Sequence, residues 1–192
     1  MGTPKLLLDV GGQTVLARLL VGLENAGVSS RWVVVHPDDA EIRAEVERHG
    51  GSALVPDAPP PDMRASAAYG LTFLRARFRD RGEVPPPDAP WLLVPADHAV
   101  LSAGIVTALL EAARVNPGRI FIPTYRGRPG HPTVFAWRHA LEVDQIPPDK
   151  GFNWIVRRHT ADVVHVPVEN EGVVLDLDTP EDYERVKAIW RT

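Results

Sequence analysis

The chain has 192 residues, a formal net charge of −4 and no cysteine, and 44% of its residues are hydrophobic. This size and composition are typical of one globular domain over residues 1–192, and they exclude a disordered or fibrous chain. The balanced charge without a basic run argues against nucleic-acid binding, and the lack of cysteine excludes disulfides and thiolate chemistry. No apolar run approaches the roughly 18 residues of a membrane span and no secretory signal is evident, so we expect a cytoplasmic protein without membrane contact.

Helical and extended patterns alternate along the chain after a loop-like start. Apolar side chains spaced three or four apart indicate helices, and short β-branched or apolar runs indicate strands. Proline-rich segments at residues 57–62 and 81–90 are expected to be loops. In chain order the expected elements are a helix at 13–26, a strand at 32–35, a helix at 37–49, a strand at 53–55, a helix at 63–78, a strand at 91–94, a helix at 105–114, strands at 119–124 and 133–136, a helix at 153–159, strands at 163–168 and 173–175, and a helix at 180–190.

This order of elements predicts an α/β fold. Strands that alternate with helices form βαβ units with parallel strands, so we expect a three-layer α/β/α, Rossmann-like, mostly parallel sheet. The last third of the chain is more mixed, which favours an antiparallel strand or a small excursion there. A doubly wound sheet normally opens with a strand that leads into a ligand-binding turn. Residues 1–5 are loop-like and lead into a helix, so the usual first strand is absent.

Two apolar segments end in acidic residues. Residues 92–94 lead to Asp97, and residues 173–175 lead to Asp176 and Asp178. An apolar strand that stops at a carboxylate places it at the C-terminal edge of the sheet, where α/β folds bind ligands. Two such ends side by side supply the oxygen ligands that Mg²⁺ prefers, so we expect these three carboxylates to hold Mg²⁺ with a nucleotide. For Asp178 the alternative is a cap of the last helix, a role for which Thr179 is better suited.

Five short motifs occur in a fixed order. They are Met1-Gly2-Thr3-Pro4-Lys5-Leu6-Leu7-Leu8, Met63-Arg64-Ala65-Ser66 with Gly70-Leu71, Pro95-Ala96-Asp97, Arg128-Pro129-Gly130-His131-Pro132, and Leu175-Asp176-Leu177-Asp178-Thr179-Pro180-Glu181-Asp182-Tyr183. In this order they resemble the MobA-like nucleotidyltransferase family, most closely its molybdenum-cofactor cytidylyltransferase branch. The family opens with a strand and a glycine-rich loop ending Arg-Met-Gly-x-x-Lys-x-Leu-Leu, and the chain starts inside that signature. The family's frequent Asp-Gln-Pro is Asp97-His98-Ala99 here.

The resemblance implies a nucleotide-diphospho-sugar transferase-like fold and a Mg²⁺-dependent transfer of NMP. The donor would be an NTP, with CTP favoured, and the acceptor an anionic phosphorylated small molecule such as molybdenum cofactor, with pyrophosphate released. It makes Lys5 and Asp97 catalytic. A recipient molybdoenzyme or its chaperone is a further partner that the resemblance suggests. The implied nucleotide-binding residues are Lys5, Ser66, Gly70 and Asp97, and the implied acceptor-binding residues are Arg126, Arg128, Gly130 and His131.

Three alternatives stay open from the sequence. Ser66 and Gly70 are small residues that would also let a helix approach the sheet closely. The chain is alternatively a catalytically impaired relative that binds a nucleotide or a partner protein, because most of the phosphate-binding loop is missing. A start upstream of Met1 would restore that loop, since this methionine coincides with one inside the family signature.

Overall fold

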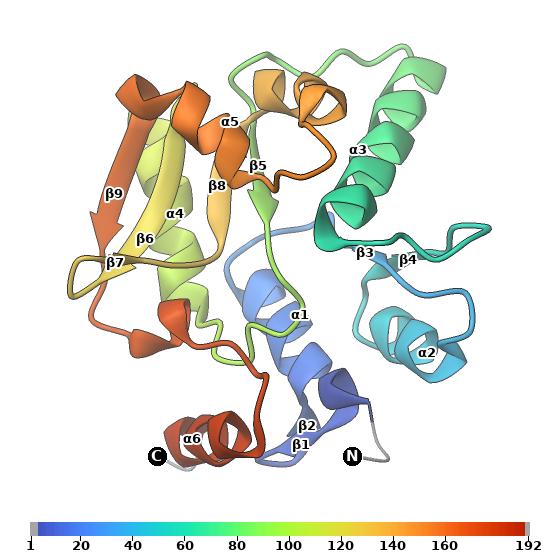
Figure 1. Cartoon of the computed structure of the whole chain (residues 1–192), viewed down its shortest axis with the longest axis vertical. Helices are drawn as coiled ribbons and strands as arrows, with labels where there is room; N and C mark the ends of the chain where they lie inside the picture. Colours follow the sequence, from blue (N-terminus) through green and yellow to red (C-terminus); the bar gives the residue numbers. More distant parts are fainter. Residues whose placement is uncertain (1–3, 191–192) are drawn as a thin grey trace.

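In the computed structural model, which describes residues 4–190, a five-stranded sheet forms the centre of the fold (Figure 1). β8 pairs antiparallel with β5 and with β6, and β9 pairs parallel with β6, so β5, β6 and β9 share one direction. The expected antiparallel strand in the last third is therefore confirmed. The strands of this sheet are β5 (Pro90–Leu93), β6 (Ile120–Tyr125), β7 (Arg128–Pro129), β8 (Thr133–Ala136) and β9 (Val163–Pro167).

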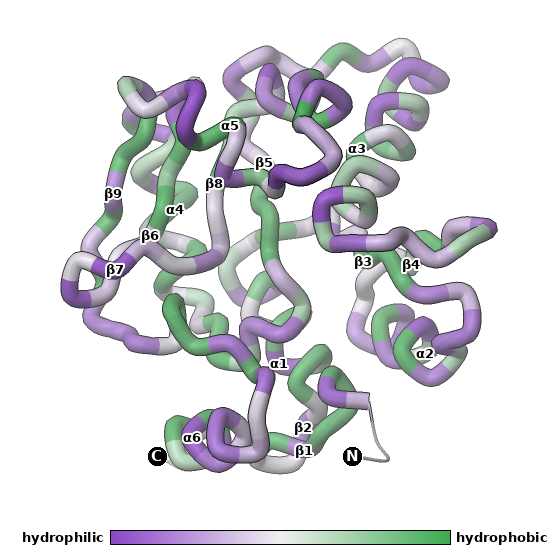
Figure 2. The backbone as a smooth tube through the Cα atoms, in the orientation of Figure 1, coloured by the Kyte–Doolittle hydropathy of each residue, from purple (hydrophilic) through white to green (hydrophobic). Residues whose placement is uncertain are grey.

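The side chains of the central strands explain why the sheet lies between helices. Along β6, Ile120 and Ile122 pack into one apolar cluster, whereas Phe121 between them packs into another. Because successive side chains of a strand point to opposite faces, both faces of this strand are buried. Figure 2 shows the hydrophobic colour along β5 and β6. Helix α4 covers one face, and helices α3 and α5 cover the other.

The helices follow the predicted order closely. Three of the α-helices have a capping side chain at the N-terminus: Thr14 accepts from the backbone N–H of Ala17, Asp62 from that of Ala65, and Ser102 from that of Ile105. The α-helices are α1 (Val15–Asn25), α2 (Ala40–Arg48), α3 (Met63–Asp80), α4 (Ala103–Val115), α5 (Asn153–Arg158) and α6 (Pro180–Trp190). The 3₁₀ helices are η1 (Lys5–Leu7), η2 (Trp137–Leu141), η3 (Val143–Gln145), η4 (Thr160–Asp162) and η5 (Glu171–Val174). No helix within residues 4–190 is long and apolar enough to cross a membrane.

A second, smaller sheet stands apart from the central one. β3 (Trp32–Val34) pairs parallel with β4 (Ser52–Leu54), and within the described residues neither pairs with β5. Partly buried side chains of β3, β4 and β5 nevertheless pack against one cluster built on α1. Within residues 4–190, no strand joins β3 to β5.

Two local predictions need correction. The apolar run at residues 173–175 predicts a strand, but η5 covers residues 171–174 instead. Val173 and Leu175 are apolar because they fill two core clusters, and a short apolar run does not distinguish this from strand pairing. The predicted elements also omit a hairpin that joins β1 (Asp9–Val10) to β2 (Gln13–Thr14). Its turn is Gly11-Gly12, with both φ angles positive, as tight hairpin turns require.

Candidate active site

Lys5 joins two of the predicted metal-binding carboxylates. Its Nζ lies 2.9 Å from Oδ2 of Asp97 and 3.1 Å from Oδ1 of Asp178. Lys5 opens η1, Asp97 lies between β5 and α4, and Asp178 lies just before α6. The backbone N–H of Leu177 donates to the carbonyl oxygen of Asp97 at 3.2 Å and ties these loops together. Three segments that are far apart in the sequence therefore meet at one point.

The electrostatics of this point favour a cation. Burial acts to lower the pKa of Lys5, but hydrogen bonds to Asp97 and Asp178 and the charges of these carboxylates hold it above its usual value. The ammonium group is therefore charged at neutral pH. It lies where two carboxylate oxygens converge, which is the donor set that a hard divalent cation prefers. The residues present thus fit a divalent metal.

The third predicted carboxylate has a different partner. Oδ1 of Asp176 lies 3.0 Å from Nδ1 of His98, a contact that is close but not aligned as a hydrogen bond. The His98 ring is 1% exposed, and its Nε2 lies 2.9 Å from the carbonyl oxygen of Val173. The ring of His131 meets that of His98 edge-on at 5.3 Å, and burial, together with His98, lowers the pKa of His131. The structure thus groups Asp176 with two histidines.

His98 is a residue that the sequence reasoning did not assign to the site. Its one signal is its place after Asp97, where the resembled family often has glutamine. The partners of His98 come from residues 131, 173 and 176, and no spacing in the sequence indicates contacts over such a separation.

The predicted acceptor loop is held by close backbone contacts. The N–H of Gly130 donates to the carbonyl oxygen of Pro123 at 2.9 Å, and the N–H of His131 donates to that of Val173 at 2.8 Å. A Cβ atom added at Gly130 would lie 1.9 Å from the carbonyl oxygen of Val173. Only glycine permits this approach of the loop to η5.

Gly130→Ala is therefore expected to destabilise the fold. The new methyl group forces the loop away from Val173, and overpacking of this kind costs about 1–3 kcal/mol. Urea unfolding followed by circular dichroism measures the change. Gly151→Ala is the matched control, because a Cβ at Gly151 meets nothing within 4 Å. Equal midpoints for the two variants would contradict the assigned contact.

The two arginines of this loop differ in position. The guanidinium of Arg126 lies over the Tyr125 ring, 5.2 Å from its centre. Arg128 instead lines a cleft of about 300 Å³. The same cleft reaches Asp178, so it links the acceptor loop to the Lys5 site. The lining residues are Tyr125, Arg128, Glu171, Val174, Leu175, Asp176, Asp178, Asp182 and Arg185.

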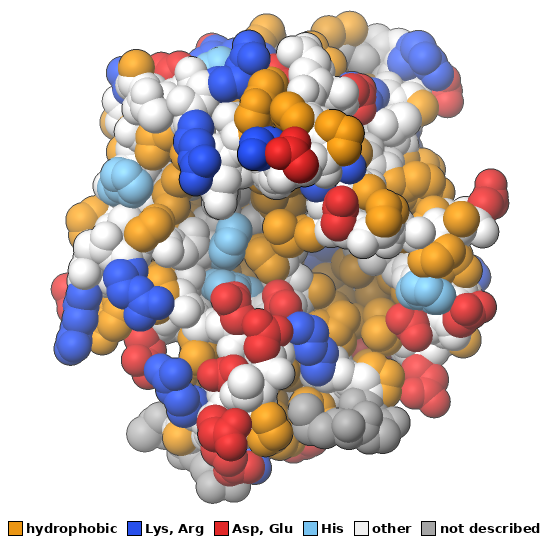
Figure 3. All heavy atoms as spheres, in the orientation of Figure 1, with side chains coloured by type: hydrophobic (Ala, Val, Ile, Leu, Met, Phe, Trp, Pro, Cys, Tyr) orange, Lys and Arg blue, Asp and Glu red, His pale blue; other side chains and the backbone are white. Residues whose placement is uncertain are grey.

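Figure 3 shows this face of the molecule with acidic side chains gathered at the lower centre. Beside them the surface is hollowed, and hydrophobic side chains lie at the bottom of the hollow.

Arg185 of α6 is a second cation in the cleft that Arg128 lines, and it lies 3.9 Å from Glu171 and 4.0 Å from Asp182. The sequence analysis did not single out Arg185, because a lone arginine on an amphipathic helix is ordinary.

The cap of α6 positions Asp178. Oδ2 of Asp182 accepts from the backbone N–H of Asp178 at 3.3 Å and of Thr179 at 2.9 Å. In return, the N–H of Asp182 donates to Oγ1 of Thr179 at 3.2 Å, as in a capping box. Hydrogen bonds from Thr179 lower the pKa of Asp182. Thr179 therefore caps the helix, and the carboxylate of Asp178 is left to contact Lys5.

Ser66 and Gly70 lie in α3, away from these contacts. Ser66 Oγ donates to the carbonyl oxygen of Asp62 within the same helical turn. A Cβ at Gly70 would lie 3.5 Å from the Val34 side chain of β3. Among residues 4–190 neither has a hydrogen bond to Lys5, Asp97 or Asp178. Their surroundings favour close packing of α3 on β3, and their role toward a nucleotide stays a prediction.

The fold is shared with solved structures. The Rv0371c homolog from Mycobacterium sp. strain JC1 is 26% identical with a TM-score of 0.77, covering 100% of this chain and 90% of its own. Rv0371c from Mycobacterium tuberculosis H37Rv in complex with manganese is 23% identical with a TM-score of 0.74, covering 97% and 93%. The 2-C-methyl-D-erythritol 4-phosphate cytidylyltransferase from Thermus thermophilus is 19% identical with a TM-score of 0.65, covering 98% and 95%.

A family model extends this likeness to the sequence itself. No protein with a curated function matches the chain. The model of the MobA-like NTP transferase domain, however, matches residues 1–163, which include Lys5, Asp97 and the acceptor loop. This match spans most of the chain. The chain therefore belongs to the MobA-like NTP transferase domain family and is a nucleotidyltransferase.

Proposed function

We propose that this enzyme transfers NMP from an NTP, with CTP favoured, to an anionic phosphorylated small molecule in the cytoplasm. The contact of Lys5 with both Asp97 and Asp178 carries the proposal, because it joins a phosphate-neutralising cation to a hard-metal donor pair. A phosphate oxygen of the acceptor attacks the α-phosphorus of the NTP. The bond from that phosphorus to the bridging oxygen breaks, and pyrophosphate leaves with the electron pair.

Asp97 and Asp178 would hold Mg²⁺, with Asp176 as a further candidate ligand. When bound, Mg²⁺ neutralises charge on the α-phosphate and orients it for in-line displacement. Lys5 offsets charge on the nucleotide phosphates. Ser66 and Gly70, both in α3, would lie beside the base and ribose of the nucleotide.

The acceptor would lie in the cleft beside Asp178. Arg128, supported by Arg126, binds its phosphate, since a guanidinium group makes paired hydrogen bonds to phosphate. Gly130 and His131 shape the loop that meets the acceptor. Molybdenum cofactor is the first candidate acceptor, with a molybdoenzyme or its chaperone receiving the product, and sugar phosphates and phospholactate-type acceptors are the next to test.

One observation favours a second function, that of a nucleotide-binding or partner-binding protein with little activity. No strand within residues 4–190 lies between β3 and β5, and a phosphate cradle is normally built from backbone N–H groups of a glycine-rich turn. The carboxylates that meet at Lys5 argue against this function.

Titration with CTP and with GTP, each with and without Mg²⁺, separates the two functions. We expect Mg²⁺ to strengthen binding, and we expect a chain lengthened ahead of Met1 by a strand and a glycine-rich loop to bind more tightly and to release pyrophosphate with an acceptor. Equal NTP affinity in the two chains would contradict the idea that a glycine-rich loop ahead of Met1 binds the phosphates. Tight binding by both without pyrophosphate release, over a panel of acceptors, would favour the binding protein.

A further inference from the structure

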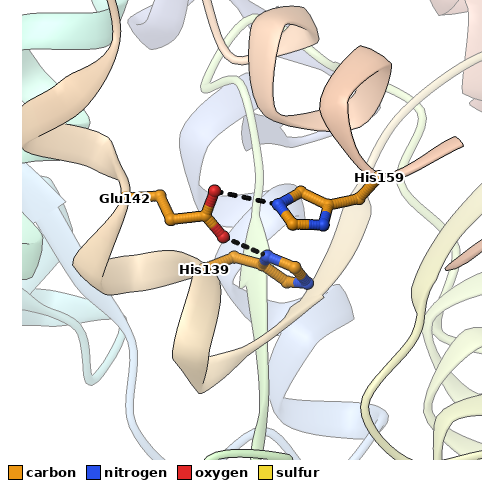
Figure 4. Close-up of side chains that lie close together, drawn as sticks. All are labelled: His139, Glu142 and His159. Carbon is orange, nitrogen blue, oxygen red and sulfur yellow. Dashed lines mark hydrogen bonds and ion pairs between the residues drawn. The ribbon is translucent and has the colours of Figure 1, made fainter.

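Two histidines and a glutamate lie together between η2 and α5 (Figure 4). Nδ1 of His139 is 2.8 Å from Oε1 of Glu142, and Nε2 of His159 is 2.8 Å from Oε2 of the same carboxylate. The three potential ligand atoms lie within 4.8 Å of one another. Ligand atoms about 2.1 Å from one ion in a tetrahedral site lie about 3.4 Å apart, so small side-chain rotations would place all three around an ion.

The cluster combines a buried anchor with an accessible side. His139 is fully buried, whereas the side chains of Glu142 and His159 are 17% and 28% exposed. Nε2 of His139 has no hydrogen-bond partner within the described residues, so the ring's polar contact is made by Nδ1, toward Glu142. An ion can thus enter from the side of His159, with a water molecule as its fourth ligand.

The donor set decides which ion fits. Two imidazole nitrogens and one carboxylate oxygen are typical of Zn²⁺ sites, whereas Mg²⁺ and Ca²⁺ prefer oxygen ligands alone. Arg158, whose Nε lies 4.0 Å from Oε2 of Glu142, is the nearest competing cation. Its guanidinium is also over the Trp154 ring, which offers it a second partner.

The cluster and Lys5 lie at opposite ends of the strands of the central sheet. β8 runs antiparallel to β6, so its end, which leads into η2, is at the same edge as the start of β9. η4, which follows His159, leads into that start. Asp97 follows the end of β5, at the other edge of the sheet. The cluster therefore cannot share an ion with Asp97 and Asp178.

We propose that His139, Glu142 and His159 form a second metal site, which binds Zn²⁺ and fastens the end of α5 to the segment between η2 and η3. The ion would replace the two hydrogen bonds between Glu142 and the histidines with bonds from all three side chains, and its binding needs no substrate.

The test measures Zn²⁺ binding to the full chain after treatment with a chelator and in excess Mg²⁺. We expect one Zn²⁺ per chain by calorimetry, and a rise in melting temperature of about 5–10 °C at 100 times the dissociation constant. His159→Ala should lose both effects. His165→Ala, which removes an exposed histidine of β9, should keep them. His159→Gln is the second variant if the alanine variant folds poorly.

Asp178→Asn separates this site from the proposed catalytic one and should still bind Zn²⁺. The proposal is overturned if the unsubstituted chain binds no Zn²⁺, if folded His159 variants bind it as tightly as the unsubstituted chain, or if Asp178→Asn alone abolishes binding.

Discussion

Asp97→Asn is expected to lower kcat/KM for the NTP by about 10²- to 10³-fold, because it removes one of the two carboxylates that converge on Lys5. Asparagine keeps the size of the side chain but not its charge, so a bound metal loses an anionic ligand. The change in kcat/KM is measured from the rate of pyrophosphate release at varied NTP and Mg²⁺ concentrations, in a form of the protein that is active. The Mg²⁺ concentration for half-maximal rate should rise as well.

Asp80→Asn is the matched control, because Asp80 is an exposed carboxylate at the end of α3 whose nearest charged partner is Arg79. Its kcat/KM should stay unchanged. Asp176→Asn tests the third predicted ligand. If Asp176 acts on the acceptor side through His98, its loss should affect the acceptor more than Mg²⁺. A fully active Asp97→Asn variant would remove the basis for a metal at this point.

Arg128→Ala is expected to lower the specificity constant for the acceptor by roughly 10- to 150-fold, with NTP binding nearly unchanged. The guanidinium lines the cleft that reaches Asp178, and one charge-assisted contact to a phosphate is worth about 1.5–3 kcal/mol. Steady-state kinetics with each substrate varied in turn measures both constants.

Arg126→Ala should cost less, since the Arg126 guanidinium lies over Tyr125 and does not line the cleft. Arg114→Ala, an exposed arginine of α4 paired with Glu111, is the neutral control. If Arg128→Ala weakens the nucleotide and spares the acceptor, the loop belongs to the nucleotide half of the site.

The order of helices and strands could be predicted because each central element carries its own signal. Residues 133–136 and 180–190 have the predicted bounds in the structure, since an apolar run and a proline start mark them locally. The segment at 173–175 could not be assigned in this way. Val173 faces the core from a 3₁₀ turn, and its carbonyl oxygen makes tertiary contacts with His98 and His131 that the sequence does not indicate.

The candidate site could be predicted in part. Asp97 and Asp178 can be predicted as candidates because each follows an apolar segment and lies in a motif of the resembled family, and the structure brings both to Lys5. The contact of Asp176 with His98 could not be predicted, because it depends on the burial of His98 in the fold and no sequence spacing indicates it. The cluster of His139, Glu142 and His159 is also invisible in sequence. Its second histidine is 17 positions from Glu142 and lies in the turn that follows α5.

The contact between Lys5 and Asp178 joins residues 173 positions apart, at nearly opposite ends of the chain. α6 reinforces it, because the hydroxyl of Tyr183 donates to the carbonyl oxygen of Asp9 in the first hairpin. Contacts of such long range form only after the intervening chain is ordered, and domains fold as synthesis proceeds from the N-terminus. The contact at Lys5 consequently forms only after Asp178, just before α6, has been synthesised. A chain that stops before Asp178 lacks this contact, however well the central sheet has formed.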